Sequence, residues 1–352
     1  MMNIHELLEI VVKRQASDLH LVVGYPPVLR IGEELVNLLG DSLSAENTQT
    51  AILSILTPEQ KELFLANHEL DFSLSLPFSR FRVNAYFQRG AMAASFRAIP
   101  LKIKTIEELG LPEVCHSFAR LKQGLVLITG PSVQGKSTTL AAILDEINRE
   151  KACHIISIED PIEYVYPKRK ALISQREMKL DTYSWAVALR SVLREDPNVV
   201  LIGEMRDQET IDAALTTAET GHLVFTTLHT NSAAQAIDRI VDVFSADEQN
   251  QARLQLSLTL EGIFCQRLIP AISRERIPAY EILLKTPAVA NTIREGKSHL
   301  IDNIIQTSGD IGMISFEGCL VDLLLAGKIS LEVAQSYTLR PVEFLRMWKN
   351  RK

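Results

Sequence analysis

The residues best suited to chemistry lie between positions 124 and 139. Gly130 to Ser137 reads Gly-Pro-Ser-Val-Gln-Gly-Lys-Ser, which fits the Walker A pattern G-x-x-x-x-G-K-[ST]. In such a loop, glycines let the backbone close around phosphate groups, while backbone amides and a helix N-terminus supply hydrogen-bond donors. A chance glycine-rich turn is the alternative, and the position between an apolar run and a helical pattern disfavours it. The segment therefore predicts a site for ATP.

The loop residues have different expected roles. We expect Lys136 to reach the β- and γ-phosphates and the Ser137 hydroxyl to bind Mg²⁺. The residues expected to contact the nucleotide are Gly130, Ser132, Val133, Gln134, Gly135, Lys136, Ser137 and Thr138. Val133 is unusual because a β-branched residue tolerates positive φ poorly. If Val133 has an ordinary φ, ATP binding should be nearly unaffected, and a positive φ would weaken it through backbone strain.

Acidic residues follow two later apolar runs, where parallel strands would end. After 154–158 come Glu159, Asp160 and Glu163, which either lie near the nucleotide or form a solvated acidic loop. After 199–202 comes Glu204, which we expect to deprotonate the attacking water and to bind Mg²⁺ through water.

Two histidines and two arginines are further candidates. His222 and His229 bracket the apolar run 223–228, and a neutral imidazole there could sense the γ-phosphate, join a subunit contact or be purely structural. Arg82 and Arg97 could neutralise transition-state charge from a neighbouring subunit, although each could equally be a surface arginine.

The elements that must position these residues fall into two groups. Residues 1–100 combine helical patterns with runs of period two, which predicts a small α+β domain. Residues 101–112 have mixed charge and no period, so we expect a linker there. Residues 113–352 alternate apolar runs with helical patterns, which is typical of an α/β domain with a mainly parallel sheet. From about 287 onward the pattern predicts only short helices.

Composition excludes several other classes of protein. The chain has 352 residues with 46% hydrophobic and 23% charged residues, as a globular protein does. It shows no apolar run of membrane-spanning length and no signal-peptide pattern, so we expect a cytoplasmic protein. A net charge of -6 argues against nucleic acid as the partner. The scattered cysteines predict reduced, structural thiols; they are Cys115, Cys153, Cys265 and Cys319.

Taken together, these motifs resemble the secretion-superfamily hexameric ATPases, and within them the branch that retracts type IV pili. The resemblance covers nearly the whole chain. Its most specific parts are similar to the family's Asp box (158–163), Walker B segment (194–207) and His box (221–230). Thr226 and the stretch 287–292 depart from the family pattern, as do Val133 and Gln134 in the loop.

The resemblance implies a fold and an activity. The expected fold is a PAS-like domain followed by a RecA-like ATPase domain, assembled as a homohexamer that drives pilus retraction and twitching motility. The ring would act on a platform protein of the inner membrane, at its cytoplasmic face, and work with a paralogous pilus ATPase. The resemblance assigns Glu204 as the base, Glu163 as an Asp-box acid, His222 and His229 as His-box residues, and Arg82 and Arg97 as arginines acting across subunits.

Relatives that extend pili or belong to type II secretion usually carry an additional N-terminal domain and a four-cysteine zinc element, and this sequence shows neither. That favours retraction over extension. An accessory, weakly hydrolysing ring subunit of a pilus or type II secretion machine stays open as the alternative.

Overall fold

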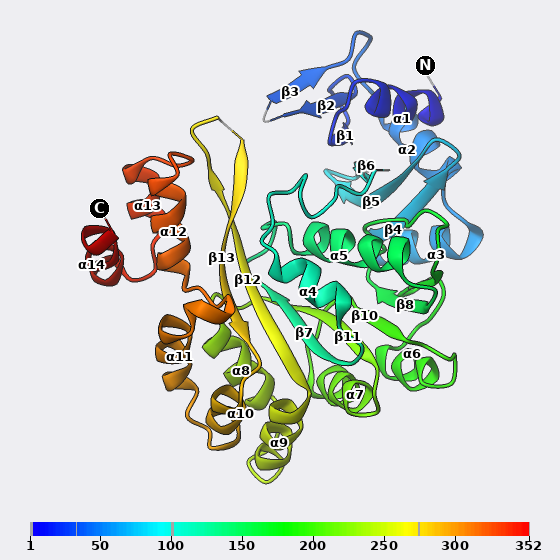
Figure 1. Cartoon of the computed structure of the whole chain (residues 1–352). Coiled ribbons are helices and arrows are strands. Elements are labelled where there is room, and N and C mark those ends of the chain that lie inside the picture. Colours follow the sequence, from blue (N-terminus) through cyan, green and yellow to red (C-terminus); the bar gives the residue numbers. More distant parts are fainter. Residues whose placement is uncertain (1–2, 33, 100–101, 274, 352) are drawn as a thin grey trace. The chain divides into compact units, whose positions relative to one another are not determined.

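The structure describes residues 3–32, 34–99, 102–273 and 275–351. In this computed structural model they form two compact units, drawn in Figure 1. The first comprises Met1–Lys102 together with Pro161–Val165, and the second comprises Ile103–Asp160 and Tyr166–Lys352. Positions 100 and 101, at the start of the predicted linker, lie outside the described residues.

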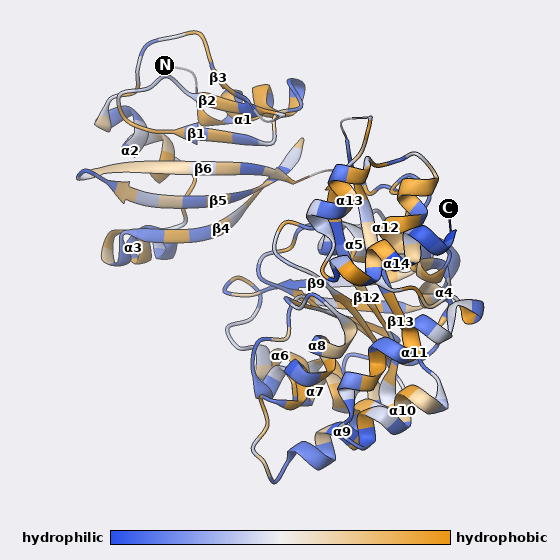
Figure 2. Cartoon of the chain, turned by 90° about the vertical axis from the view of Figure 1, so that its left-hand side faces the viewer, coloured by the Kyte–Doolittle hydropathy of each residue, from blue (hydrophilic) through white to orange (hydrophobic). Residues whose placement is uncertain are grey.

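The first unit is built on a six-stranded antiparallel sheet with the order β3-β2-β1-β6-β5-β4. Its strands are β1 (Asp18–Leu21), β2 (Val28–Ile31), β3 (Glu34–Asn37), β4 (Glu69–Leu76), β5 (Ser79–Gln88) and β6 (Ala91–Ile99). Its helices are α1 (Ile4–Lys13), α2 (Ala45–Ser54) and α3 (Pro58–Asn67). Along β5, Phe81, Val83 and Ala85 are buried while the residues between them are half-buried. Figure 2 shows this alternation as changes of colour along the strand.

The second unit contains a seven-stranded sheet with the order β13-β12-β7-β11-β10-β8-β9. Neighbouring strands from β12 to β9 run parallel, whereas β13 pairs antiparallel with β12. The strands are β7 (Gly124–Thr129), β8 (His154–Glu159), β9 (Leu172–Glu177), β10 (Val199–Ile202), β11 (Leu223–Leu228), β12 (Leu260–Pro270) and β13 (Arg276–Leu284). The predicted α/β class is therefore confirmed.

Helices cover both faces of this sheet. The helices are α4 (Val114–Arg120), α5 (Lys136–Glu150), α6 (Trp185–Val192), α7 (Gln208–Glu219), α8 (Ala233–Val241), α9 (Gln249–Thr259), α10 (Pro287–Arg294), α11 (Ile301–Thr307), α12 (Phe316–Leu325), α13 (Leu331–Tyr337) and α14 (Pro341–Arg351), with short 3₁₀ turns η1 (Ser298–Leu300) and η2 (Gly309–Ile311). Val126 and Ile128 of β7 face a core shared with α4 and α5. Leu125 and Leu127 face a second core, to which α6 to α11 contribute. Alternate residues of one strand thus supply two cores, which is why the strand is apolar throughout.

Helix α5, which follows the phosphate loop, is buried over most of its length. From Thr139 to Asn148 every residue has less than a tenth of its surface exposed. The charged members are paired: Asp145 lies 3.3 Å from both Arg149 and Arg169, and Glu146 lies 2.7 Å from the His116 ring. Buried charges are tolerated when they are paired in this way.

The last helices pack on the end of the β12–β13 hairpin. Residues of α12, α13 and α14 share an apolar cluster with Ile269 of β12 and Ala279 of β13. The sequence predicts the other C-terminal helices but not α13, and it also misses α4, β3, β9 and β12. The apolar run of β12 is interrupted by Gln266 and Arg267, so its pattern gives no clean strand signal.

Candidate nucleotide-binding and catalytic site

Four adjacent parallel strands bring the predicted residues to one edge of the sheet. The strands β7, β11, β10 and β8 are neighbours, so their carboxyl ends lie at the same edge. Gly130 follows β7, His229 follows β11, Glu204 lies just beyond β10, and Glu159 ends β8. Segments far apart in the chain therefore meet here, as the sequence predicts.

The two loop glycines are required by their surroundings. Gly130 has a φ of +144°, and a Cβ there would lie 2.2 Å from the carbonyl oxygen of Gln266. Gly135 has a φ of +81°, and its Cβ would lie 2.9 Å from Gln266 Nε2. Only glycine combines these backbone angles with such close contact. The loop backbone is consequently pressed against β12.

The structure answers the question raised by Val133. Its φ is 62°, in the left-handed region, and the side chain is 75% exposed. A β-branched residue in this region carries strain of about 1 to 3 kcal/mol. With so little burial, the side chain gains little packing energy to offset that strain.

Gln266 ties the loop to its strand and its helix. Its Nε2 donates to the Gln134 carbonyl oxygen at 2.8 Å, and its Oε1 accepts from Thr139 Oγ1 at 2.6 Å. In return, the backbone amide of Leu268 donates to Gln134 Oε1 at 2.6 Å. Gln266 is 3% exposed, so this amide is fully committed to holding the loop.

Lys136 opens helix α5 and is 8% exposed. Its Nζ donates to the carbonyl oxygens of Gly130 at 2.7 Å and Pro131 at 2.9 Å. The cap position before it is Gly135, which has no side chain to satisfy the first helical amides. Ser137 and Thr138 lie in the same first turn. Ammonium, hydroxyl and helix N-terminus together form an anion-binding surface.

His229 connects the phosphate loop to Glu204. Its Nε2 lies 3.2 Å from Glu204 Oε1, and its Nδ1 lies 3.4 Å from both Lys136 Nζ and Ser132 Oγ. An ammonium can only donate, so Nδ1 must accept and the ring proton sits on Nε2, where it donates to the carboxylate. This neutral tautomer satisfies all the contacts at once.

Glu204 is held by further contacts on its own segment. Its side chain is 23% exposed, and its Oε2 accepts from Arg206 Nε at 2.8 Å. The preceding residue, Gly203, accepts from Thr227 Oγ1 at 2.7 Å through its carbonyl oxygen. Adjacent strands thereby fix the backbone from which the carboxylate projects.

His222 is not brought to this site. It precedes β11, whereas the loop and His229 lie beyond the far end of that strand. Its Nδ1 is 3.1 Å from both the Thr217 carbonyl oxygen and Thr220 Oγ1, so it closes the end of α7. The two His-box histidines are separated because a strand of this length carries its two ends to opposite edges of the sheet.

The Asp-box acids differ in their surroundings. Glu159 is 8% exposed, and its Oε1 accepts from Ser157 Oγ at 2.7 Å and Gln175 Nε2 at 3.2 Å. Asp160 lies 3.6 Å from Lys179 Nζ. Glu163 belongs to the segment grouped with the first unit, and its role toward nucleotide stays a prediction.

Arg82 and Arg97 are paired neighbours on β5 and β6 of the first unit. Arg97 Nε donates to Asp18 Oδ1 at 2.9 Å, and the Asp18 side chain is largely buried. The two arginines thus stand side by side in the sheet, and Arg97 is paired with a buried carboxylate. Whether that charge serves a nucleotide across subunits stays a prediction.

Three supporting residues were not predicted from the sequence: Gln266, Arg206 and Thr227. Gln266 has a recognisable signal, because a glutamine inside an apolar run is unusual and demands buried hydrogen-bond partners. Arg206 contacts Glu204 from two residues away on the same segment. Thr227 acts from the neighbouring strand β11, so only strand order reveals its role.

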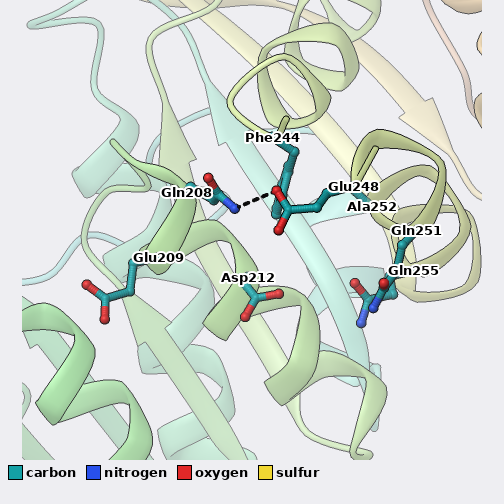
Figure 3. A pocket seen from close by; sticks show the side chains of 8 residues that line it. All are labelled: Gln208, Glu209, Asp212, Phe244, Glu248, Gln251, Ala252 and Gln255. Atoms are coloured by element: carbon teal, nitrogen blue, oxygen red, sulfur yellow. Dashed lines mark hydrogen bonds between the residues drawn. The ribbon is translucent and has the colours of Figure 1, made fainter. Parts of the chain in front are cut away.

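A hollow of about 400 Å³ lies elsewhere, against α7 and α9. Figure 3 shows its lining, in which Gln208 donates to Glu248 at 3.1 Å. None of the predicted nucleotide residues lines it. This hollow is therefore separate from the phosphate loop. Within the described ranges, every helix is too short or too polar to span a bilayer.

Comparisons with known proteins identify the family of the chain. Residues 92–303 match the family described as type II/IV secretion system protein. The chain is 47% identical over 344 residues to the type IV pilus retraction ATPase PilT of Pseudomonas aeruginosa, covering 97% of this chain and 100% of that protein. It is 40% identical over 338 residues to the type IV pilus ATPase PilU of the same organism, covering 96% and 88%.

Solved structures give the same result. A crystal structure of the pilus retraction motor PilT with bound ADP has a TM-score of 0.92 at 41% identity, covering 99% of this chain and 100% of that one. The ATPase DotB of Legionella pneumophila has a TM-score of 0.79 at 28% identity, covering 94% of each chain. The fold of the whole chain is therefore one known from secretion and pilus ATPases.

Replacing Val133 by glycine should relieve the strain of the left-handed residue. We expect the strain energy of about 1 to 3 kcal/mol to be recovered partly as tighter binding of ATP and partly as a higher free energy of unfolding. Titration with ATP measures the change in affinity. Denaturant unfolding with saturating ATP measures the change in stability of the complex. Val133→Asn is the matched control, since asparagine tolerates this φ without the backbone freedom of glycine. If both variants behave like the native chain, Val133 is not strained.

Replacing Gln266 by methionine should loosen the phosphate loop. The substitution keeps the volume but leaves the Gln134 carbonyl and the Thr139 hydroxyl without partners, at a cost of about 1 to 3 kcal/mol each. We expect ATP affinity to fall at least about tenfold, as measured by nucleotide titration. Gln255→Met on α9, remote from the loop, should leave the affinity unchanged. Unaltered affinity in the Gln266 variant would contradict the anchoring role.

Proposed function

The chain belongs to the type II/IV secretion system protein family, and on that basis we propose that it is an ATP-hydrolysing motor of the type IV pilus retraction class. The observation that carries the proposal is the connected series of Lys136, His229 and Glu204, which links a phosphate cradle to a carboxylate. Lys136, at one end of the series, is needed to bind phosphate. Glu204, at the other end, is needed to activate water.

The donor set suits ATP and Mg²⁺. Gly130 and Gly135 leave a backbone cradle with no room for side chains, and the uncapped amides of α5 suit phosphate oxygens. The Ser137 hydroxyl and the Glu204 carboxylate offer the oxygen ligands that Mg²⁺ prefers, the latter through water. When bound, Mg²⁺ would neutralise charge that develops on the phosphates.

The residues of the chain then have distinct tasks. Lys136 binds the β- and γ-phosphates, and Glu204 orients the attacking water and takes its proton on a carboxylate oxygen. His229 donates from Nε2 to Glu204, while its Nδ1 faces Lys136. The histidine thereby makes the position of the base depend on the phosphate loop.

The assembly follows from the family. We place the chain in a homohexamer in which Arg82 and Arg97 supply positive charge to a neighbouring subunit. In this assembly Glu163 lies near the nucleotide, and His222, away from the phosphate loop, lies at a subunit contact. The adjacency of the two arginines on one sheet face supports this placement. The ring would act on a pilus platform protein at the inner face of the cytoplasmic membrane, together with a paralogous ATPase.

An accessory motor is the second candidate, because the chain is also 40% identical to PilU. The 47% identity to PilT, over the entire length of that protein, favours the retraction motor itself. The strained Val133 is the feature that favours weak hydrolysis. A motor driven by nucleic acid is disfavoured by the net charge of -6.

Replacing Glu204 by glutamine should abolish turnover while preserving ATP binding. Loss of a general base lowers the rate by about 10² to 10⁴-fold, and the amide still accepts from His229. Phosphate release with Mg²⁺ measures the rate, and nucleotide titration measures binding. Glu209→Gln, an exposed acid in the first turn of α7, should turn over normally. Native protein that binds ATP tightly but releases no more phosphate than Glu204→Gln would instead be an accessory subunit.

Deleting the gene should leave surface pili in place but stop their retraction and twitching. Retraction requires force from hydrolysis, so a copy carrying Glu204→Gln should fail to restore it while the native copy succeeds. Fluorescently labelled pili, followed in single cells, measure retraction directly. Disappearance of the pili on deletion would assign the chain to assembly, and persistent retraction would assign it to an accessory role.

A further inference from the structure

Glu281 is a buried acid that none of the catalytic tasks above uses. It lies within β13, is 3% exposed, and its Oε1 accepts from the backbone amide of Ala233 at 2.8 Å. Ala233 is the first residue of α8. Burial of a carboxyl group destabilises the fold unless hydrogen bonds or charges compensate for its desolvation. An acid at such a position is therefore expected to have a role.

The helix that Glu281 holds begins at Ala233, four residues after His229. Residues 229–232 join β11 to α8, so the N-terminus of α8 is one anchor of the catalytic histidine. Within that turn, Ser232 Oγ accepts from the Gln235 amide at 3.3 Å, and Gln235 Oε1 accepts from the Asn231 amide at 3.1 Å. These bonds stiffen the segment locally, and the bond to Glu281 fixes it to the sheet.

Charged or titratable groups from three further elements lie around the same carboxyl. Asp302 of α11 forms an ion pair with Arg340, which precedes α14. Glu317 of α12 is 1% exposed, and its Oε1 accepts from the backbone amides of Leu339 and Arg340 at 3.1 and 3.0 Å. Cys265 of β12 lies directly opposite Glu281 in the sheet. The C-terminal helices therefore present both signs of charge to Glu281.

We propose that Glu281 is a positioning residue that couples the C-terminal helices to catalysis, by anchoring the N-terminus of α8 and hence His229 against Glu204. The inference rests on the function proposed above. Glu281 touches no reacting atom in this scheme and acts through Ala233 and the segment 229–232. Rearrangement of the C-terminal charges would alter the anchor and so the position of the histidine.

The charge state of Glu281 gives this coupling a pH dependence. Burial, followed by the negative charges of Asp302 and Glu317, raises its pKa to about 7, against the opposing effects of the Ala233 hydrogen bond and Arg340. The protonated form therefore stabilises the fold at low pH, and that contribution is lost as the pH rises through about 7. The ionised form is the stronger acceptor for the Ala233 amide and complements the α8 dipole. Ionisation thus strengthens the hydrogen bond to Ala233, while it lowers the stability of the fold as a whole.

Hydrogen exchange of the 229–236 amides tests the anchor without relying on activity. After correction for intrinsic rates, protection in the native chain should rise between about pH 6 and about pH 8. Glu281→Gln keeps the shape and the acceptor but cannot ionise, so its protection should be the same at both values. Glu317→Gln is the matched control, since it should keep the rise but shift it to lower pH by removing a like charge.

Kinetics separate positioning from simple stabilisation. In the native chain, kcat for ATP should rise with pH through about 7, and Glu281→Gln should remove that step while KM stays within about twofold. Glu281→Leu removes the acceptor and should lower kcat by about tenfold to a hundredfold, as displaced catalytic groups do, with KM little changed.

A pH-dependent protection in Glu281→Gln equal to that of the native chain would overturn the inference, and so would an unchanged kcat in a folded Glu281→Leu variant. Absence of turnover in the native chain would refute the proposed function instead. In that event the exchange measurement still decides whether Glu281 anchors α8.

Discussion

The close approach of the phosphate loop to β12 is the contact on which the rest of the site depends. The Gln266 carbonyl lies where a side chain of Gly130 would be, and the Gln266 amide holds Gln134 and Thr139. Because β12 is the next strand to β7, the loop is supported along its side as well as at its ends. That support fixes the first turn of α5, and with it Lys136 and Ser137. A loop with a strained residue can be tolerated because its neighbours overdetermine its shape.

A second constraint comes from the order of the strands. β11 lies between β7 and β10, so His229 stands between the phosphate loop and Glu204. One imidazole can then satisfy an ammonium on one nitrogen and a carboxylate on the other. Residues that are far apart along the chain thereby form one short series of hydrogen bonds. Because β11 separates its two ends, His222 lies at the opposite edge of the sheet and takes part in closing α7 instead.

Much of this arrangement could be predicted from the sequence because the motifs have fixed spacing. The loop Gly130–Ser137 and the apolar strands β8, β10 and β11 carry strong local signals, so the α/β class and the shared edge could be inferred. Strand β12 could not, because Gln266 and Arg267 interrupt its pattern for reasons that only its neighbours explain. The backbone φ of Val133 could not be predicted for a similar reason. The surrounding chain sets this angle, and the preference of valine itself does not.

Helix α5 has a mechanical consequence. Its side chains are packed on every side and its buried charges are neutralised by His116, Arg149 and Arg169, so it cannot bend or slide without opening a close-packed interior. Such interiors have low compressibility and pass displacement on to their neighbours. A displacement of the loop end of α5 is therefore passed on to α4, which α5 contacts through the pair of Glu146 and His116. The helix therefore moves as a rigid body.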